Sequence, residues 1–271
     1  MNITPVVLTF NEDRNIENTL SSLRWASRIV VVDSGSTDNT AKLAHSFSNV
    51  DWFVRKFDTH KAQWTYAIHQ TSIETDYVLA LDADMRPTVE FQHEVEAFLK
   101  NAKFDGARIA FEYRVLGRPL IGSIYPAQTR LFRKNKVQIA QPGHSQEFVV
   151  AGNVYRFRSR LIHEDLKPFS RWLKNQISYA ALEASRIRSH PRTGVKDWLR
   201  SVGLAPPIVG AVSYIRAGGP LRPAAAKAYA WERLIFEAIL ARMLAERAQE
   251  AVPQRVEPDG SVLEEVCNSR P

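Results

Sequence analysis

The sequence predicts an α/β fold built on a mostly parallel central sheet with flanking helices, followed by a helical C-terminal extension. Over the first hundred residues, short apolar runs rich in β-branched residues alternate with helix-forming segments, which is typical of βαβ units. The run Ile29-Val30-Val31-Val32 is uninterrupted, as in a strand that is buried on both faces of a parallel sheet. Polar clusters follow the predicted strands directly, at the end where open α/β sheets bind their ligands.

Strands are expected at residues 5–9, 29–32, 52–54 and 77–81. The helix after the first strand carries Ile16, Leu20 and Leu23 on one face, and the preceding segment 11–13 can cap it. Further helices are expected after the polar turn 33–38, over roughly 62–72, and from about Thr88 onward. Together these elements form a predicted donor half that extends to about residue 105.

After Gly106 the pattern changes to strands with interleaved basic residues, at 107–116, 129–133 and 154–161. We expect this segment, with a long helix at about 168–188, to be the acceptor half of one domain covering residues 1–190. Residues 191–250 form a predicted apolar, helical extension with a second long helix at about 224–249, and this extension could lie in a membrane interface. Residues 251–271, rich in proline and mixed charges, are expected to be a disordered tail.

The composition favours a negatively charged partner without naming it. Net charge is +7 and the pI is about 9.6, which suits nucleotide phosphates, an anionic membrane face or nucleic acid, although a generally basic surface is the alternative. Lysines and arginines are spread along the chain rather than clustered with exposed aromatic residues, which disfavours a nucleic-acid-binding protein.

Localisation is expected to be cytoplasmic. The single cysteine, Cys267, has no partner for a disulfide, and the N-terminal residues lack the pattern of a secretory signal. No stretch approaches the roughly 18 uncharged apolar residues of a spanning helix. The second long helix mixes aromatic residues with arginines, so it could lie at the inner face of the membrane, pack on a second subunit, or bury its apolar side against the catalytic domain.

Asp82 and Asp84 stand at the end of the apolar run 77–81 and suggest a metal site. Two adjacent carboxylates repel each other unless a cation offsets their charge. In an extended backbone the side chains at i and i+2 point the same way, so both could reach one ion. Mg²⁺ or Mn²⁺ prefers such oxygen ligands and leaves positions open for substrate phosphates. A surface turn is the alternative explanation of this motif.

Three segments taken together resemble family 2 of the glycosyltransferases, which have the GT-A fold. They are Thr9-Phe10-Asn11-Glu12, then residues 30–38 with Asp33-Ser34-Gly35-Ser36-Thr37-Asp38, then Leu81-Asp82-Ala83-Asp84. The resemblance is closest to bacterial lipopolysaccharide-core β-glucosyltransferases. It is firm over residues 1–100 and traceable to about 190.

The resemblance implies a donor site at these motifs. Asp33 would lie beside the nucleotide base, although Ser34 stands where many relatives have a second acidic residue. Asp82 and Asp84 would hold the metal that bridges the donor diphosphate. The donor-binding residues implied in this way are Thr9, Asn11, Glu12, Asp33, Lys61, Gln63, Asp82 and Ala83. The alternatives are a turn-stabilising role for Asp33 and an ordinary solvated helix start for Lys61 and Gln63.

The resemblance also implies a third metal ligand and a general base. His163, which follows the last predicted strand, is the implied ligand; a structural histidine is the alternative. Relatives carry an acidic residue, often as His-Glu, near the segment Gly143-His144-Ser145-Gln146-Glu147, where this chain separates the histidine from the glutamate. We favour Glu147 over His144 as the base, with Asp165 as a further candidate.

The implied reaction is an inverting, metal-dependent transfer of a sugar from a nucleotide-sugar donor, with UDP as the expected nucleotide. The acceptor would be a hydroxyl of a glycan or a lipid-linked saccharide, as in cell-envelope polysaccharide or lipopolysaccharide synthesis. The alternatives are a catalytically inactive nucleotide-sugar-binding protein and a nucleotidyltransferase. Residues 7–15 contain no glycine, which counts against the phosphate loop of a nucleotidyltransferase and against a Rossmann dehydrogenase.

Overall fold

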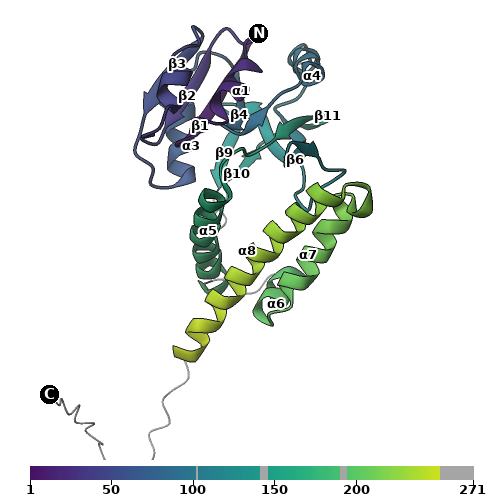
Figure 1. The fold of residues 1–271 in the computed structure, drawn as a ribbon. Coiled ribbons are helices and arrows are strands. Elements are labelled where there is room, and N and C mark those ends of the chain that lie inside the picture. Colours follow the sequence, from purple (N-terminus) through teal and green to yellow (C-terminus); the bar gives the residue numbers. More distant parts are fainter. Residues whose placement is uncertain (102, 141–145, 190–193, 251–271) are drawn as a thin grey trace, which may run out of the picture.

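The computed structural model describes residues 1–101, 103–140, 146–189 and 194–250. Within them the chain forms a mixed sheet with helices on both faces and a helical region on one side of it (Figure 1). The strands are β1 (Ile3–Thr9), β2 (Ile29–Asp33), β3 (Val50–Val54), β4 (Tyr77–Asp82), β5 (Met85–Arg86), β6 (Gly106–Val115), β7 (Arg118–Pro119), β8 (Gln128–Arg133), β9 (Val137–Ala140), β10 (Glu147–Val150) and β11 (Val154–His163).

The helices follow the predicted alternation with strands and then fill the C-terminal part of the described chain. They are α1 (Ile16–Ser21), α2 (Thr40–Ala44), α3 (His60–His69), α4 (Val89–Leu99), α5 (Phe169–Ser189), α6 (Gly194–Ser201), α7 (Ala205–Arg216), the 3₁₀ turn η1 (Gly219–Leu221) and α8 (Pro223–Glu250).

The main sheet has the order β3-β2-β1-β4-β8-β6-β11-β5, with β7 paired to β6. The strands from β3 to β4 are all parallel, whereas β8 runs antiparallel to both β4 and β6. One continuous sheet therefore joins the predicted donor and acceptor halves. This sheet, its flanking helices and the helical C-terminal region confirm the predicted fold class.

Side-chain alternation along the central strands builds a core on each face of the sheet. On β2, Ile29 and Val31 belong to the core cluster that includes Ile16 and Leu20 of α1, whereas Val30 and Val32 belong to the cluster that includes Trp64 of α3. Since both faces are covered, all five residues of β2 are buried, as the uninterrupted β-branched run predicts.

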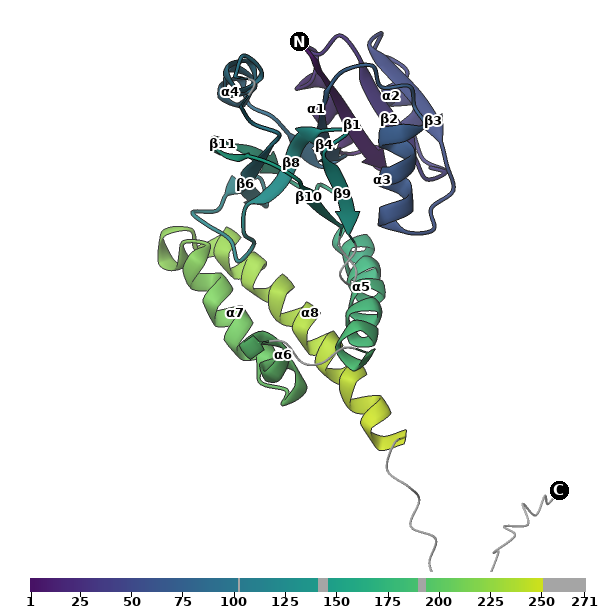
Figure 2. The same ribbon diagram turned by 180° about the vertical axis from the view of Figure 1, so that it is seen from behind.

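The helical region extends away from the sheet, and α8 lies between α5 and α7 in both views (Figures 1 and 2). Buried ion pairs join three of its helices: Arg200 of α6 contacts Glu183 of α5 at 2.7 Å and Glu237 of α8 at 2.6 Å. Among the described residues, no helix is both long enough and apolar enough to cross a membrane. The predicted tail at 251–271 lies outside the described residues.

The sequence-based expectations differ from the structure in two local respects. The segment 11–13 does not cap α1, because Asn11 turns back on the loop after β2 with a positive φ of 54° and Asn15 occupies the cap position. The short strands β5, β7, β9 and β10 are absent from the prediction. Strands of two to four residues are too short to show a periodic pattern.

Candidate active site

The three motifs meet at one edge of the sheet because their strands are parallel and in register. Thr9, the last residue of β1, lies opposite Asp33, the last residue of β2. On the other side of β1, Leu8 lies opposite Asp82, the last residue of β4. Residues that are far apart in the sequence are thereby placed side by side at the carboxyl ends of three adjacent strands, which is where α/β sheets bind ligands.

Asp33 is buried and orders the loop that follows it. Its Oδ2 accepts hydrogen bonds from the backbone N–H groups of Gly35 (2.9 Å) and Ser36 (2.7 Å), and its Oδ1 accepts one from the Ser36 hydroxyl. The Asn11 side-chain oxygen accepts a hydrogen bond from the Thr37 N–H at 2.7 Å. This turn-stabilising role is the alternative that the sequence left open, and a contact of Asp33 with a nucleotide base remains a prediction.

Gln63 and Lys61, at the start of α3, have different surroundings. Gln63 is fully buried: its side-chain oxygen accepts from Arg55 at 2.6 Å, and its amide donates to the Ser34 hydroxyl at 3.2 Å and the Arg55 carbonyl at 3.1 Å. Lys61 is exposed. The fully used amide of Gln63 fixes the loop beside Asp33, and a direct contact of either residue with the diphosphate remains a prediction.

Asp84 and His163 are brought together by the pairing of β5 with β11. In this antiparallel pair His163 lies opposite Met85, the residue after Asp84, and the Glu164 N–H donates to the Asp84 carbonyl at 3.0 Å. The Nε2 atom of His163 is 3.8 Å from Oδ2 of Asp84. The other oxygen, Oδ1, is buried and has no hydrogen-bond partner among the described residues. The prediction that these two side chains share a site therefore has a geometric basis.

A buried ion-pair network lies beside this pair. The Lys167 ammonium is 2.5 Å from Oε1 of Glu12 and 3.3 Å from Oδ2 of Asp165. Asn15 donates hydrogen bonds to both Glu12 and Asp165, at 2.8 and 3.2 Å. Lys167 thus joins the segment after β11 to the segment after β1.

Burial and charge set the ionisation of this network. Burial, supported by the negative charge of Asp84, raises the pKa of Glu12 to about 7, against the opposing effect of Lys167. Burial also disfavours the charged form of Lys167, but the carboxylates of Asp84, Glu12 and Asp165 outweigh it and raise the pKa of its ammonium. Lys167 therefore stays protonated at neutral pH.

Asp82, in contrast, is paired with a cation on β8. Its Oδ2 accepts from the Arg130 guanidinium at 3.2 Å, and Gln128 holds that guanidinium from the other side. The neighbouring Ala83 points its methyl group into the core, and its carbonyl accepts from the Thr19 hydroxyl at 2.7 Å. A contact between Ala83 and the nucleotide-sugar donor remains a prediction. It would have to be made by a backbone atom other than the carbonyl oxygen.

Thr9 has one free polar group at this edge. Its hydroxyl is buried and has no hydrogen-bond partner among the described residues. Its carbonyl is already used by the Ser34 N–H at 2.9 Å.

The side chains around Asp84 could hold a hard divalent cation through two protein ligands. The carboxylates of Glu12, Asp82, Asp84 and Asp165 face two cations, Lys167 and Arg130, so negative charge is in excess. Asp84 presents a buried Oδ1 that has no hydrogen-bond partner among the described residues, and a ring nitrogen of His163 is 3.8 Å from its other oxygen. In the part of the chain that the structure describes, no group of three or more His, Cys, Asp or Glu residues surrounds one point. Mg²⁺ typically takes one or two carboxylates and completes its coordination with substrate phosphates and water.

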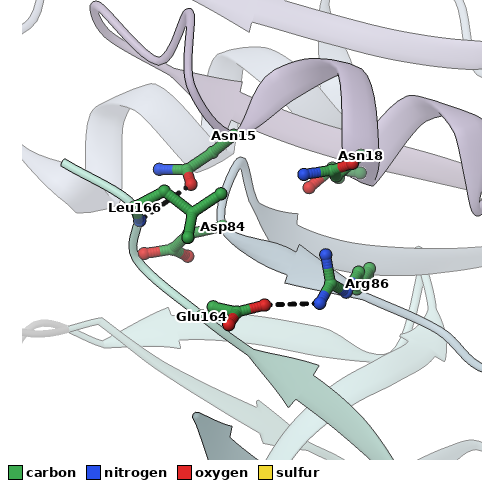
Figure 3. A pocket seen from close by; sticks show the side chains of 7 residues that line it. Asn15, Asn18, Asp84, Arg86, Glu164 and Leu166 are labelled. Carbon is green, nitrogen blue, oxygen red and sulfur yellow. Dashed lines mark hydrogen bonds and ion pairs between the residues drawn. The ribbon is translucent and has the colours of Figure 1, made fainter. Parts of the chain in front are cut away.

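A small polar hollow opens beside Asp84, between α1 and the segment after β11 (Figure 3). Asn15 holds one side of it by accepting the Leu166 N–H at 3.0 Å, and the Arg86–Glu164 ion pair, 2.5 Å long, forms the other. Asn18 and Thr19 of α1 complete the lining. The pair of Arg86 with Glu164 fixes the turn that carries Asp84.

The three candidate bases have different positions. Glu147 is exposed at the first residue of β10, where Phe148 anchors the strand by packing on Trp64 and Phe132. His144 lies outside the described residues. Asp165 has both carboxylate oxygens engaged by Lys167 and Asn15, which suits a residue that holds the network in place.

The sequence analysis did not identify the aromatic wall that adjoins His163. The Tyr113 ring is 4.7 Å from the His163 ring and 5.3 Å from the Tyr125 ring. The Arg233 guanidinium of α8 lies over the rings of Tyr125, Tyr229 and Trp172, at 5.7 to 5.9 Å. Its Nε is buried without a hydrogen-bond partner among the described residues.

Sequence signals for the missed residues are weak. Arg130 could have been noticed as a charged residue directly before the buried pair Leu131-Phe132, and Lys167 as part of the charged run after His163. Arg233 is one of several arginines on α8, and only the packing of α8 against the sheet region distinguishes it.

Comparison with known proteins identifies the family. The sequence profile described as "Glycosyl transferase family 2" matches residues 5–161, more than half of the chain. The chain therefore belongs to glycosyltransferase family 2, which confirms the resemblance drawn from the three motifs.

Two curated relatives are similar in sequence. An uncharacterized glycosyltransferase of Rickettsia bellii (strain RML369-C) is 30% identical over 145 residues, which cover 51% of this chain but only 48% of that protein. The lipopolysaccharide core biosynthesis glycosyltransferase LpsC of Rhizobium meliloti (strain 1021) is 26% identical over 231 residues, covering 80% of this chain and 82% of that protein.

Solved structures are more distant. S. aureus TarS in complex with UDP-GlcNAc has 16% identity and a TM-score of 0.49, with 92% of each chain covered. Glucosyl-3-phosphoglycerate synthase from Mycobacterium tuberculosis, in complex with Mn²⁺ and UDP, has 16% identity and a TM-score of 0.46, with 72% of this chain and 82% of that chain covered.

Proposed function

We propose that this protein is an inverting, metal-dependent glycosyltransferase that moves a sugar from a UDP-sugar to a hydroxyl of a glycan or lipid-linked acceptor. The observation that carries the proposal is the pair Asp84–His163 just after β4, in which Asp84 has a buried carboxylate oxygen without a partner among the described residues. Membership in the family supports transfer from a nucleotide sugar. The likeness to LpsC supports an acceptor in the lipopolysaccharide core.

In this proposal Asp84 and His163 hold Mg²⁺ or Mn²⁺, and Asp82 lies close by in its pair with Arg130. The ion would supply positive charge where the nucleoside diphosphate leaves. The excess of carboxylates keeps the site favourable for a cation, and Lys167 limits the repulsion among them. Asp82 stays a candidate metal ligand and donor-site residue, and the other candidate donor-site residues are Thr9, Asn11, Glu12, Asp33, Lys61, Gln63 and Ala83.

We place the acceptor on the side of the site where the aromatic wall adjoins His163. Tyr113, Tyr125 and Trp172 offer flat apolar surface of the kind that sugar rings pack against, and Arg233 has an unused N–H within that wall. The acceptor oxygen loses its proton to the base and forms a bond to the anomeric carbon. The bond from that carbon to the diphosphate oxygen breaks on the opposite face.

Glu147 is the proposed base. Its carboxylate is exposed at the start of β10, next to the segment that holds His144. We expect Glu147→Gln to lower transfer by about 10²–10⁴-fold, the usual contribution of a general base, while donor affinity stays the same. Unchanged turnover in Glu147→Gln would move the role to His144 or Asp165.

The first experiment is a thermal-stability measurement against a panel of nucleotides and nucleotide sugars, each with and without Mn²⁺. A ligand that binds only the folded state raises the melting temperature by mass action, by an amount that depends on its concentration relative to Kd. The proposal expects a rise with UDP or a UDP-sugar that requires the metal. A shift with a nucleoside triphosphate alone would favour a nucleotidyltransferase. Binding of a UDP-sugar without transfer or hydrolysis would indicate an inactive binding protein.

The division into a catalytic domain of residues 1–190 and a helical extension of residues 191–250 is also a proposal. Contact with a membrane is the remaining part of the sequence-based expectation.

A further inference from the structure

The outer surface of α6, α7 and the turns beside them exposes large apolar side chains. These residues follow one another along the segment 195–221, and each is between 40% and 78% exposed. They are Val195, Trp198, Val202, Leu204, Ile208, Val212, Ile215 and Leu221, and are referred to below as the apolar surface. Exposed apolar surface of this extent is uncommon on a soluble monomer and marks a place of interaction.

Helix α7 exposes its large apolar residues, whereas an ordinary surface helix buries them. Its buried residues are the small ones, Ala205, Gly210 and Ser213, whereas Ile208, Val212 and Ile215 form an exposed stripe at spacings of four and three. The small residues let α7 approach α8 closely: a Cβ added at Gly210 would lie 3.3 Å from the Leu234 side chain. The large apolar residues therefore remain outside because packing against α8 does not need them.

A groove between α7 and α8 continues this surface. Its volume is about 260 Å³, and its lining includes Ala211 and Tyr214 of α7 and Leu234 of α8, with exposed Trp231 and Lys227 also on α8. In both views α7 lies on the side of α8 that faces away from α5 (Figures 1 and 2). No described element of the chain covers the exposed stripe of α7.

The charges around the apolar surface have one sign. Lys196, Arg216, Arg222 and Lys227 are exposed, and the single acidic residue between positions 194 and 231 is Asp197. Asp197 is buried and paired with Arg186 of α5 at 3.0 Å. The exposed surface of this segment is thus apolar and cationic, without an accessible carboxylate.

We propose that the apolar surface docks on an anionic lipid bilayer, with Ile208, Val212, Ile215 and Trp198 entering the interface and the lysines and arginines contacting lipid headgroups. This combination of apolar insertion and basic residues is the chemistry of helices that lie in a membrane interface. A second copy of the chain fits less well, since a symmetric contact would place two cationic rims against each other without acidic residues to balance them.

The docking surface does not depend on the proposed transferase activity, so the two can fail separately. It narrows the sequence-based expectation of an interfacial extension at residues 191–250 to one surface, which α6 and α7 carry.

Vesicle flotation with the full-length protein tests the proposal. Vesicles of phosphatidylcholine alone are compared with vesicles that also contain phosphatidylglycerol, at low and high salt. We expect the protein to float with the anionic vesicles, to float less at high salt, and to stay in solution with phosphatidylcholine alone. The triple variant Arg216→Gln, Arg222→Gln, Lys227→Gln should lower the partition constant by about a hundredfold.

Glutamate substitutions distinguish insertion from simple charge attraction. Ile215→Glu combined with Trp198→Glu should abolish flotation, whereas Val89→Glu, at a comparably exposed position at the start of α4, should not. Unchanged melting temperatures would show that each variant is folded. The absence of wild-type flotation, or equal flotation of the double variant, would overturn the proposal. A dimer in light scattering that Ile215→Glu converts to a monomer would assign the surface to a second copy instead.

Discussion

At the residue scale, Asp84 differs from every other acidic side chain of the site because one of its oxygens is buried and lacks a partner among the described residues. The other carboxylates are held by Lys167, Arg130 or Asn15. An unsatisfied buried oxygen is costly unless a ligand completes it. This cost is the physical reason to place the cation at Asp84 rather than at Asp82. The sequence motif alone does not distinguish the two aspartates.

Asp84→Asn tests this assignment. The amide has nearly the same shape but removes a negative charge from beside Glu12 and Asp165, so we expect the melting temperature without metal to stay the same or to rise. Loss of a residue that only supports a metal ligand typically lowers metal affinity by about 10–100-fold. Because Asp84 is proposed to be a ligand itself, the affinity for the donor in the presence of Mn²⁺ should fall by more than that. Calorimetric titration with UDP and Mn²⁺ gives the affinity, and an unchanged value would count directly against the metal assignment.

Lys167 is expected to be the main structural cation of the site. Its side chain is 9% exposed, and Lys167→Met would leave Glu12 and Asp165 without their cation, which typically costs about 3–5 kcal/mol of unfolding free energy. Adding Glu12→Gln should recover a large part of that loss, since the remaining charge imbalance is smaller. Urea unfolding of the two single variants and the double variant forms a cycle that measures the coupling. Additive effects would mean that the two side chains do not interact.

At the element scale, the arrangement of α5, α6 and α8 depends on buried ion pairs as well as on apolar packing. Arg200 is 4% exposed and is flanked by Glu183 and Glu237, while Ala180, Ala184 and Leu240 make the adjoining apolar contact. Buried ion pairs of this kind give little net stability but are strongly destabilising when one partner is removed. We infer that they help to specify which helices pack together, and Arg200 is the residue that tests this.

Arg200→Met leaves Glu237 without its cation and Glu183 with Arg186 alone, and we expect it to lower the free energy of unfolding by about 3–5 kcal/mol. Arg242→Met is the matched control on α8, because Arg242 pairs with Glu246 while both side chains are more than half exposed. Exposed pairs of that type contribute about 0–1 kcal/mol. Equal losses in the two variants, measured by chemical denaturation, would show that the buried network does not hold the helices.

At the scale of the whole molecule, the helical extension contributes to the site as well as to the proposed membrane contact. Tyr229 of α8 accepts a hydrogen bond from the Ile124 N–H at 3.2 Å, and Arg233 contacts Tyr125. On the other side, α5 buries Ala184 and Ile187 against Phe236 and Leu240. The extension thereby packs against the aromatic residues that adjoin His163.

A chain truncated after Ser189 tests whether the first domain can exist alone. Without α8, the apolar side of α5 and the carboxylate of Glu183 become exposed, so we expect the truncated chain to aggregate or to melt well below the full-length protein. Solubility and melting temperature are the measurements. A soluble truncated chain with the same metal-dependent response to UDP would instead support an independent domain of residues 1–190.

The sequence by itself determined the alternation of strands and helices, the buried parallel strands, and the three motifs at their carboxyl ends. These features depend on local periodicity and on the rule that parallel strands end at one edge, so no knowledge of distant contacts is needed. The same patterns are sufficient to recognise the glycosyltransferase family. They also placed His163 at a strand end, next to the motif it was expected to join.

Only the tertiary structure decided which charges meet. Lys167 and Glu12 are 155 residues apart, Arg130 and Asp82 are 48 apart, and the pairing of β5 with β11 sets the distance from Asp84 to His163. Such pairs follow from sheet order and from how the helical region packs, which local patterns do not encode. The outward position of the large residues on α7 was likewise decided by packing, because the close approach of α7 to α8 uses small side chains and leaves the large ones exposed.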